Sequence, residues 1–482
     1  MNYKLLFILC FVSNLIFGQL NIEWETSIGV SNAQQGNTKP RIVLNGAKEP
    51  VVVFGKNSGE LYLTKMVGNQ FSAPQQFASN GMAYVNYWTS ADLGSKGDTI
   101  YIVFKTLPLE TGSIYLVRSF DGGTTLSDTI LIDHQQPGVA WLPSLEVDQN
   151  GQPHVVYMGH DQNWISPNYY IIHSNDFGAS FSNAQNITDG IAVEACDCCP
   201  SELVIEANQQ VLLYRNNNQN LRDIYGVYSD NAGLDFLSNT NVENLNWLVN
   251  SCPSTAPDGV IVDDTLWSVG ASKASGSYRV YLSKSHLTSQ INSLLSDSLA
   301  APAQVNANQN HPRIAASENY MAIVWHENTG SNYDVYVSVA PTFDGGQLYT
   351  TKILANEAVS GNQIYSDVVL DGNEIHIVYQ DNSSGTVIYR KGTIIQNNAV
   401  ENIVEPSFSC WPNPIRDKCS ISSTMNMHRV TIFDGASKAL QSYELDQPST
   451  EMKLDLSQLM PGKYTIVVDF NFRKGSMEVI KL

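Results

Sequence analysis

The sequence is short of basic residues, of cysteine and of long apolar runs. It holds 27 Lys and Arg against 46 Asp and Glu, which gives a formal net charge of −19. This excess of negative charge disfavours polyanionic partners, so we expect binding to neither nucleic acid nor an anionic membrane. Beyond the N-terminus no segment approaches the ~20 apolar residues that a membrane-spanning helix needs. We therefore predict a soluble monomer without a transmembrane segment.

The first nineteen residues differ from the rest of the chain. A lysine is followed by an apolar run over residues 5–17 and then by small and polar residues. This is the pattern of a secretory signal peptide. We predict a signal peptide over residues 1–19. Its removal leaves six of the seven cysteines, and an even number in an oxidising compartment favours disulfides.

A repeat with a period of roughly fifty residues fills most of the chain. In "WLPSLEVDQNGQPHVVYMGH", from Trp141, two apolar strands flank a polar turn, and "YYIIHS" and the turn "NDFGAS" follow. Such alternation predicts a four-stranded antiparallel meander. Seven copies predict an all-β, seven-bladed β-propeller over residues 20–400; six blades remain the alternative if one repeat is not a blade. The N-terminal "NIEWETSIG" is expected to supply the last outer strand and close the ring.

Three turns share a finer signature, reading "SFDGGTTL", "SNDFGASF" and "SDNAGLDF". They resemble the Asp-box, or BNR repeat, of the sialidase-like propellers, with Asn231 in place of Asp in the third copy. The resemblance implies a structural role away from the active face. The residues concerned are Ser119, Asp121, Gly123, Ser174, Asp176, Gly178, Ser229 and Gly233.

Residues 401–482 break the repeat. They contain an early "PNP", then "VTIFDG", "LDLSQLMPGKY" and a closing Lys481. These motifs, in this order, resemble the type A sorting domain of the type IX secretion system of Bacteroidetes. The resemblance implies a small β-sandwich and the secretion machinery as a partner. It also implies export through the periplasm and outer membrane, with release or attachment at the cell surface. Cys410 and Cys419 are expected to form a disulfide there.

The remaining cysteines lie in "EACDCCPSEL" and "NSCPS". Each segment leads into the inner strand of a blade, and in a propeller such segments share one face around the central axis. Cys196, Cys198, Cys199 and Cys252 should therefore meet at the mouth of the central pocket. We predict two disulfides, one of which joins Cys252 to the cluster; the pairing stays open.

The alternative for these cysteines is a copper or zinc site on the thiolates; no other cofactor is expected. The pattern C-x-C-C-P-[ST], followed by "RDIY", resembles a group of exported sialidase-like propellers of unassigned activity.

The same face gathers cations and aromatic rings. A hollow of this composition suits a polar ligand. We therefore predict an exported propeller that binds a polar ligand, foremost a glycan, at the mouth of its pocket. The candidate ligand-binding residues are Arg41, Trp88, Trp141, Arg222, His311, Arg313 and His326.

A sialidase-like glycoside hydrolase is the alternative, so whether the protein is an enzyme stays open. The segment "QIYSDVVLDG" resembles the part of sialidases that carries the catalytic tyrosine, which implies Tyr365. The same resemblance implies that Arg41, Arg222 and Arg313 hold the substrate carboxylate. Glu327 would then be the partner carboxylate of Tyr365 and Asp161 the acid. The chain departs from the sialidase pattern at "KPRIVL", which lacks the usual [FY]-R-I-P around the first arginine.

Overall fold

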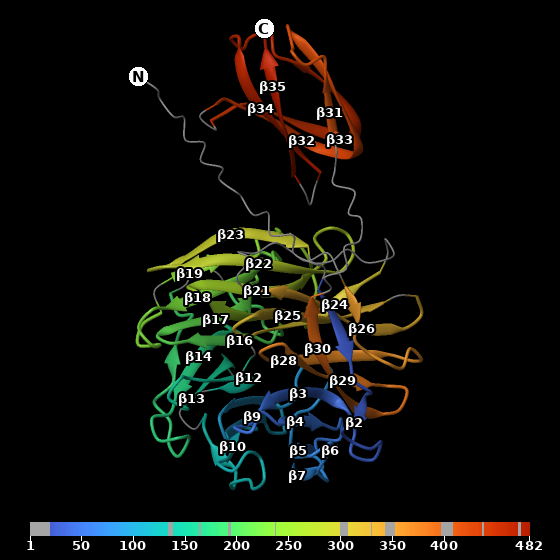
Figure 1. Cartoon of the computed structure of the whole chain (residues 1–482). Helices are drawn as coiled ribbons and strands as arrows, with labels where there is room; N and C mark the ends of the chain where they lie inside the picture. Colours follow the sequence, from blue (N-terminus) through green and yellow to red (C-terminus); the bar gives the residue numbers. More distant parts are fainter. Residues whose placement is uncertain are drawn as a thin grey trace, which may run out of the picture. The chain divides into compact units, whose positions relative to one another are not determined.

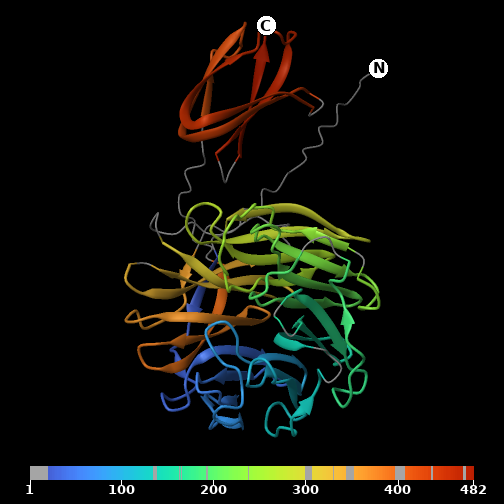
Figure 2. The same cartoon turned by 180° about the vertical axis from the view of Figure 1, so that it is seen from behind.

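The computed structural model describes residues 20–133, 138–161, 163, 165–190, 194–236, 238–298, 307–328, 330–342, 352–396, 408–435, 438–470 and 474–482. The predicted signal peptide lies outside them. Seven antiparallel sheets follow one another around a common centre in chain order (Figures 1 and 2). Each inner strand contacts the inner strands of both neighbouring sheets. The chain therefore forms a closed seven-bladed propeller, as the repeats predicted.

The first four blades each begin at their inner strand. Blade one comprises β3 (Thr38–Leu44), β4 (Pro50–Gly55), β5 (Leu61–Val67), β6 (Gln70–Phe71) and β7 (Gln75–Ala78). Blade two comprises β8 (Asp92–Lys96), β9 (Thr99–Lys105), β10 (Ile114–Ser119) and β11 (Ile130–Leu131). Blade three comprises β12 (Val139–Val147), β13 (Pro153–His160), β14 (Asn168–His173) and β15 (Gln185–Asn186). Blade four comprises β16 (Glu202–Glu206), β17 (Gln209–Arg215), β18 (Ile224–Ser229) and β19 (Ser238–Asn241).

The last three blades complete the ring. Blade five comprises β20 (Asp258–Val262), β21 (Thr265–Ser272), β22 (Arg279–Leu287) and β23 (Ile291–Ser298). Blade six comprises β24 (Gln309–Ala316), β25 (Tyr320–Asn328), β26 (Tyr333–Pro341) and β27 (Ile353–Leu354). Blade seven comprises β28 (Gln363–Asp371), β29 (Glu374–Asp381) and β30 (Thr386–Gln396), with β1 (Leu20–Trp24) and β2 (Ile28–Gly29) from the N-terminus.

Closure of the ring joins the two ends of the propeller chain. β1 pairs antiparallel with β30, with Leu20 opposite Gln396 and Trp24 opposite Gly392. The N-terminal segment thus supplies the outer strand that the seventh repeat lacks, which confirms the prediction. Because these strands come from opposite ends of the propeller sequence, their pairing resists opening of the ring.

The core lies between the blades. Val53 of blade one packs with Phe104 of blade two, and Val337 of blade six packs with Ile377 of blade seven. The second strands are covered on both faces: every residue of β4 and β13 is buried. This explains why these strands read as continuous apolar runs in the sequence. No helix long and apolar enough to cross a membrane occurs among the described residues.

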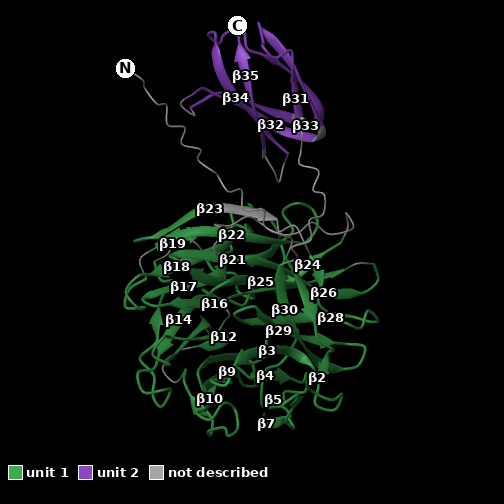
Figure 3. Cartoon of the chain, viewed as in Figure 1, with its two compact units in different colours: residues 1–397 green, residues 398–482 purple. Residues whose placement is uncertain are grey.

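Residues 398–482 form a second compact unit (Figure 3). One sheet runs β31-β32-β34-β35, and β33 pairs with β32. A parallel bridge between Ile415 and Lys481 connects the first and last parts of the unit, so the sheet curls into a near-barrel around its own core. The strands are β31 (Phe408–Trp411), β32 (Lys418–Phe433), β33 (Ala439–Asp455), β34 (Gly462–Asp469) and β35 (Lys474–Lys481).

The structure contains no bond between Cys410 and Cys419, which are free, buried thiols. They are nevertheless hydrogen-bond partners, and this contact helps to raise the pKa of Cys419 above that of an ordinary thiol. Their disulfide stays a prediction.

Candidate functional site

Seven side chains at one register position surround the propeller axis. Each lies on an inner strand opposite a valine or leucine of the second strand. Two are cations, four are carboxylic acids and one is a serine. This central ring consists of Arg41, Asp92, Ser144, Glu202, Asp258, Arg313 and Asp367.

The two arginines of the ring are already paired with its carboxylates. Arg41 Nε lies 3.3 Å from Asp92 and Nη1 lies 3.7 Å from Asp367. Arg313 Nε lies 3.1 Å from Asp367 and 3.2 Å from Asp258, and its Nη1 contacts Glu202. Burial raises the pKa of Glu202 to about 8, although Arg313 acts against it. The ring is thus a largely buried ion network in which both arginines are paired and the four carboxylic acids outnumber them.

Four ring residues also hold the next blade. Asp92 accepts a hydrogen bond from the backbone N–H of Leu145 at 2.8 Å, and Asp367 accepts one from Ile42 at 2.9 Å. In the same way, Ser144 accepts the N–H of Leu203 and Asp258 accepts the N–H of Ile314. Because each bond crosses between neighbouring inner strands, we assign the ring a structural role.

A second tier of residues lies directly before the ring. In blades one, three, six and seven the pairing shifts just before the ring position. A residue with positive φ occupies each shift: Lys39 (45°), Leu142 (50°), His311 (50°) and Tyr365 (52°). Such bulges turn a side chain away from the regular alternation and are common beside active sites.

Blades six, seven and one are consecutive, so three of these side chains meet. The ring centroids of His311 and Tyr365 lie 4.8 Å apart, edge to face. Lys39 Nζ lies 4.9 Å from the centroid of Tyr365. His326 lies behind them and accepts a hydrogen bond at Nδ1 from the Tyr365 N–H, at 3.2 Å. We name Lys39, His311 and Tyr365 the mouth cluster.

The surroundings of the mouth cluster suppress its charges. Burial, followed by Arg41 and Arg313, lowers the pKa of Lys39 to about 7. Burial also lowers the pKa of His311 well below its usual value and that of His326 to about 3. Burial raises the pKa of Tyr365 to about 12. Near neutral pH both imidazoles are therefore uncharged and Lys39 exists in both protonation states.

Two small adjoining hollows, each with a cavity volume of about 40 Å³, open beside the mouth cluster. Lys39 and Arg41 line both. Within the described part of the chain, the buried atoms Trp88 Nε1, Ser90 Oγ and Ser366 Oγ have no hydrogen-bond partner, although all three residues line the hollows. Buried polar groups normally have partners, so these walls are suited to a polar ligand or ordered water.

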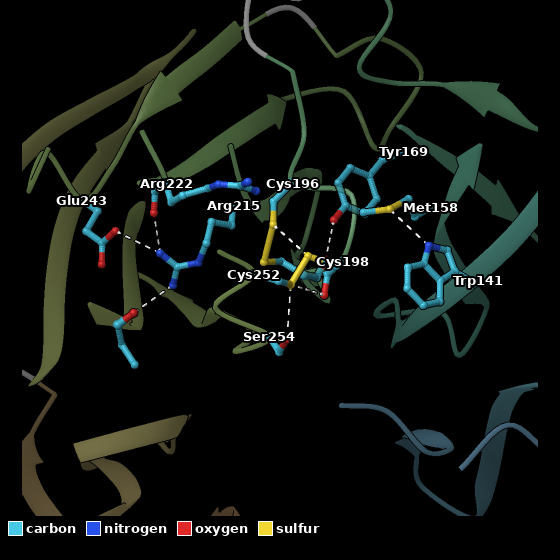
Figure 4. The surroundings of a disulfide bond; sticks show 12 residues. Trp141, Met158, Tyr169, Cys196, Cys198, Arg215, Arg222, Glu243, Cys252 and Ser254 are labelled. Atoms are coloured by element: carbon cyan, nitrogen blue, oxygen red, sulfur yellow. Dashed lines mark hydrogen bonds and ion pairs between the residues drawn. A yellow bond between two sulfur atoms is a disulfide. The ribbon is translucent and has the colours of Figure 1, made fainter. Parts of the chain in front are cut away.

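The structure separates the predicted ligand-binding residues into two groups. Arg41, Trp88, His311 and Arg313 line the hollows, and His326 supports Tyr365 from behind. The remaining two do not line them. The indole N–H of Trp141 donates to Met158 Sδ and, at 3.0 Å, to His160 Nε2 (Figure 4). Arg222 is buried in blade four. Burial lowers its pKa, and Asp197 and Glu194 act against this lowering.

The three candidate catalytic residues do not converge. Glu327 is fully buried, where it pairs with Lys352 and accepts a hydrogen bond from Gln309. Asp161 is exposed and accepts the N–H groups of Asn163 and Ile165, each at 2.9 Å, in a turn. Tyr365 is a partner of neither. Because Arg222 also lies away from Arg41 and Arg313, the described residues contain no assembled sialidase-like set around Tyr365.

The cysteines lie at the mouth of blades four and five (Figure 4). Bonds join Cys196 to Cys199 and Cys198 to Cys252. The second bond links the segment before β16 to the segment before β20, and so ties two blades together. The loop is further held by Arg215 O, which accepts the Cys196 N–H at 2.8 Å. Beneath it, Arg215 donates to the carbonyl groups of Arg222 and Ala271 and lies 3.7 Å from Glu243.

The three Asp-box turns repeat one hydrogen-bond pattern. Ser119 Oγ donates to Asp121 and accepts the Gly123 N–H at 3.0 Å. Ser174 does the same with Asp176 and Gly178, and Ser229 with Asn231 and Gly233. Gly123, Gly178 and Gly233 have φ between 76° and 84°, which favours glycine. The turns are structural parts of the blades, and Asn231 can replace Asp because its amide oxygen accepts the same bonds.

Fold and mouth together define a seven-bladed propeller with a buried ion network on its axis and a polar hollow above it. Residues 409–481 match the model of the secretion system C-terminal sorting domain. The C-terminal unit is therefore a type IX sorting domain, which indicates export to the cell surface or beyond. No curated protein matches the chain.

Several solved structures are similar. A protein of unknown function from Dyadobacter fermentans is 11% identical, with a TM-score of 0.48 over 78% of this chain and 99% of that one. Trypanosoma rangeli sialidase is 10% identical, with a TM-score of 0.44 over 95% and 89% of the two chains. An α-L-arabinofuranosidase of Fusarium graminearum is 12% identical, with a TM-score of 0.41 over 78% and 98%. These low values assign neither substrate nor activity.

Proposed function

We propose that this exported propeller binds a polar glycan in the hollows beside Lys39, His311 and Tyr365. The observation that carries the proposal is the convergence of three bulges, from three consecutive blades, on one hollow. In the walls of this hollow and the adjoining one, the buried atoms Ser366 Oγ, Trp88 Nε1 and Ser90 Oγ have no protein partner among the described residues. A sugar ring offers hydroxyl groups for these atoms and an apolar face for the aromatic rings.

The charges of the mouth favour an uncharged or weakly charged sugar. Arg41 and Arg313 are the two cations of the ring, and both already contact carboxylates. A sugar carboxylate would have to compete with these internal partners. We therefore do not propose the sialidase alternative, which requires arginines that are free to hold the substrate.

The test is binding of the purified full-length secreted chain to an array of neutral and acidic glycans, followed by calorimetry on the best ligands. We expect Tyr365→Ala to weaken binding at least about tenfold, which corresponds to about 1.4 kcal/mol. Trp88→Ala should also weaken it. Trp411→Ala is the matched control, because Trp411 is 77% exposed and belongs to the C-terminal unit.

Two results would contradict the proposal. One is the absence of binding to any glycan on the array. The other is binding that Tyr365→Ala and Trp88→Ala leave unchanged. Hydrolysis products in the same samples would instead show that the hollow is catalytic.

A further inference from the structure

The cysteine cluster contains one more bond than a link between two blades requires. The Cys198–Cys252 bond closes a separation of 54 residues, whereas the Cys196–Cys199 bond spans only three. The stabilisation that a disulfide gives through the unfolded chain grows with the length of the closed loop. The second bond therefore contributes about half as much as the first and joins no two blades, so a link between blades does not account for it.

The four sulfur atoms already have the spacing of a metal site. All lie within 4.8 Å of one another, and Cys196 Sγ is 3.7 Å from Cys198 Sγ. Four thiolates at about 2.3 Å from a tetrahedral zinc ion are themselves about 3.8 Å apart. Small shifts of the side chains would thus convert the two disulfides into a four-sulfur site.

The backbone around the cluster is held independently of the disulfides. Besides the bond from the Cys196 N–H to Arg215 O, the Tyr169 hydroxyl donates to Cys199 O at 3.0 Å. Asn217 N–H also bonds to Glu194 O. We therefore expect the three cysteines of this loop to stay together when the disulfides are reduced.

The charges near the cysteines and the exposure of their disulfides also bear on a metal site that forms on reduction. Buried Arg222 lies beside the same loop, and its Nε and Nη1 atoms have no hydrogen-bond partner within the described ranges. A cation near thiols favours their ionised, metal-binding form, while the carboxylates of Asp197 and Glu194, which interact with the same guanidinium, act in the opposite direction. Cys252 is exposed and Cys198 half-buried, whereas Cys196 and Cys199 are buried. A reductant can therefore approach the Cys198–Cys252 bond first.

We propose that Cys196, Cys198, Cys199 and Cys252 form a thiol-operated metal site, which binds one zinc or copper(I) ion when a small-molecule thiol reduces it. Each protein disulfide accepts two electrons and two protons from two molecules of the small thiol. These two molecules leave joined as one small-molecule disulfide. The Cys198 thiolate can attack Cys196 Sγ and release Cys199, which carries the reduction inward. Binding of the ion displaces the thiol protons and replaces the covalent link between the blades with a metal link. The proposal does not depend on glycan binding.

The test uses the full-length chain. A phosphine reduces it, because this reductant adds no thiol that could itself bind zinc. Native mass spectrometry with one equivalent of Zn²⁺ should show one bound ion per reduced chain and none on the oxidised chain. Loss of a partner outside the ligand shell typically weakens metal binding about 10- to 100-fold. Cys252→Ser removes a direct ligand, so it should weaken zinc binding by at least that much. Cys410→Ser is the matched control and should leave zinc binding unchanged.

Cobalt(II) absorption gives a second readout, because its intensity reports tetrahedral coordination and its sulfur charge-transfer band reports thiolates. Cys199→Ser, which keeps the Cys198–Cys252 link in the oxidised chain, covers the case in which Cys252→Ser fails to fold. The proposal is overturned if the reduced chain takes up no zinc, or if Cys252→Ser and Cys199→Ser both bind it as tightly as the wild type. It is equally overturned if reduction unfolds the chain and zinc does not restore its near-ultraviolet circular dichroism.

Discussion

The two sides of the propeller mouth are built from equivalent segments but have different properties. Before blades four and five, the segments that lead into the inner strands carry cysteines and are joined covalently. In blades six, seven and one, the start of the inner strand carries a bulge, and these bulges place Lys39, His311 and Tyr365 beside a hollow. The first side is a locked side and the second an open side.

The difference shows how one topological position serves both stability and recognition. On the locked side, Arg215 is fully buried and its guanidinium donates to two backbone carbonyl groups. On the open side, Ser366 Oγ is buried without a partner among the described residues, and Lys39 contacts an aromatic ring instead of a carboxylate. Unsatisfied groups in a hollow cost stability unless something binds there. Buried atoms without partners among the described residues also occur on the locked side, among them Arg215 Nε and two atoms of Arg222. What distinguishes the open side is the hollow beside Lys39, His311 and Tyr365, and there we expect the ligand.

The largest effect should come from breaking the locked side. The double substitution Cys198→Ser with Cys252→Ser should lower the free energy of unfolding by about 4 kcal/mol, because a long loop is released. Cys196→Ser with Cys199→Ser should cost about half as much by the same relation. Guanidinium unfolding of the oxidised proteins measures both. Equal losses would show that the link between the blades is not what the locked side contributes.

Arg313→Met tests the network beneath both sides. It leaves Asp258, Asp367 and Glu202 without their main cation, so we expect a loss of about 3 kcal/mol in the free energy of unfolding. Lys48→Met is the control, since its pair with Asp371 is exposed and should contribute less than about 1 kcal/mol. A loss at Arg313 as small as that at Lys48 would mean that the ring does not hold the blades.

The sequence predicted the strands, the seven blades, the closing strand and the face on which the cysteines meet. These follow from periodicity and topology, which local patterns encode. It also contained the signal for the central ring, because "PRIV", "SELV", "PDGV" and "SDVV" each place a charged residue at the second, equivalent repeat position. That signal was missed because the arginines were considered singly, as ligands for a substrate, without their carboxylate partners.

Other parts of the site were beyond local patterns. Positive φ at Lys39, His311 and Tyr365 is imposed by the bulges and is unusual for such residues. Lys39 was therefore missed. Trp141 lies in β12 and Arg222 between β17 and β18, but the depth of a side chain depends on packing between blades. The pairing of four cysteines likewise depends on geometry that spacing does not determine.

Substitution of Lys39 should have a smaller effect on thermal stability, and this effect should depend on pH. Its pKa is about 7 in the folded chain and about 10.5 when exposed, so the unfolded chain binds more protons between these values. Its contribution to the free energy of unfolding is therefore unfavourable below pH 7 and fades as the pH rises to 10.5. Lys39→Met should raise the melting temperature most at pH 6 and least at pH 10. Lys48→Met should show no such trend. If Lys39→Met shows none either, Lys39 lies in solvent and does not belong to the open side.

The Asp-box turns, which belong to neither side, should give the smallest effect. A hydrogen bond from the Ser180 side chain, with others from nearby groups, holds the pKa of Asp176 at about 2. Its stabilising effect is complete above the usual carboxyl value of 3.8 and is lost as the pH falls through 2. Asp176→Asn should lower the melting temperature by about 1–2 °C at pH 6 and make no difference near pH 2. Asn231 already fills the equivalent place in the third turn with the same bond from Ser229, which is why the loss should be small. A loss as large as that at Arg313 would show that the turns, and not the ring, hold the blades in place.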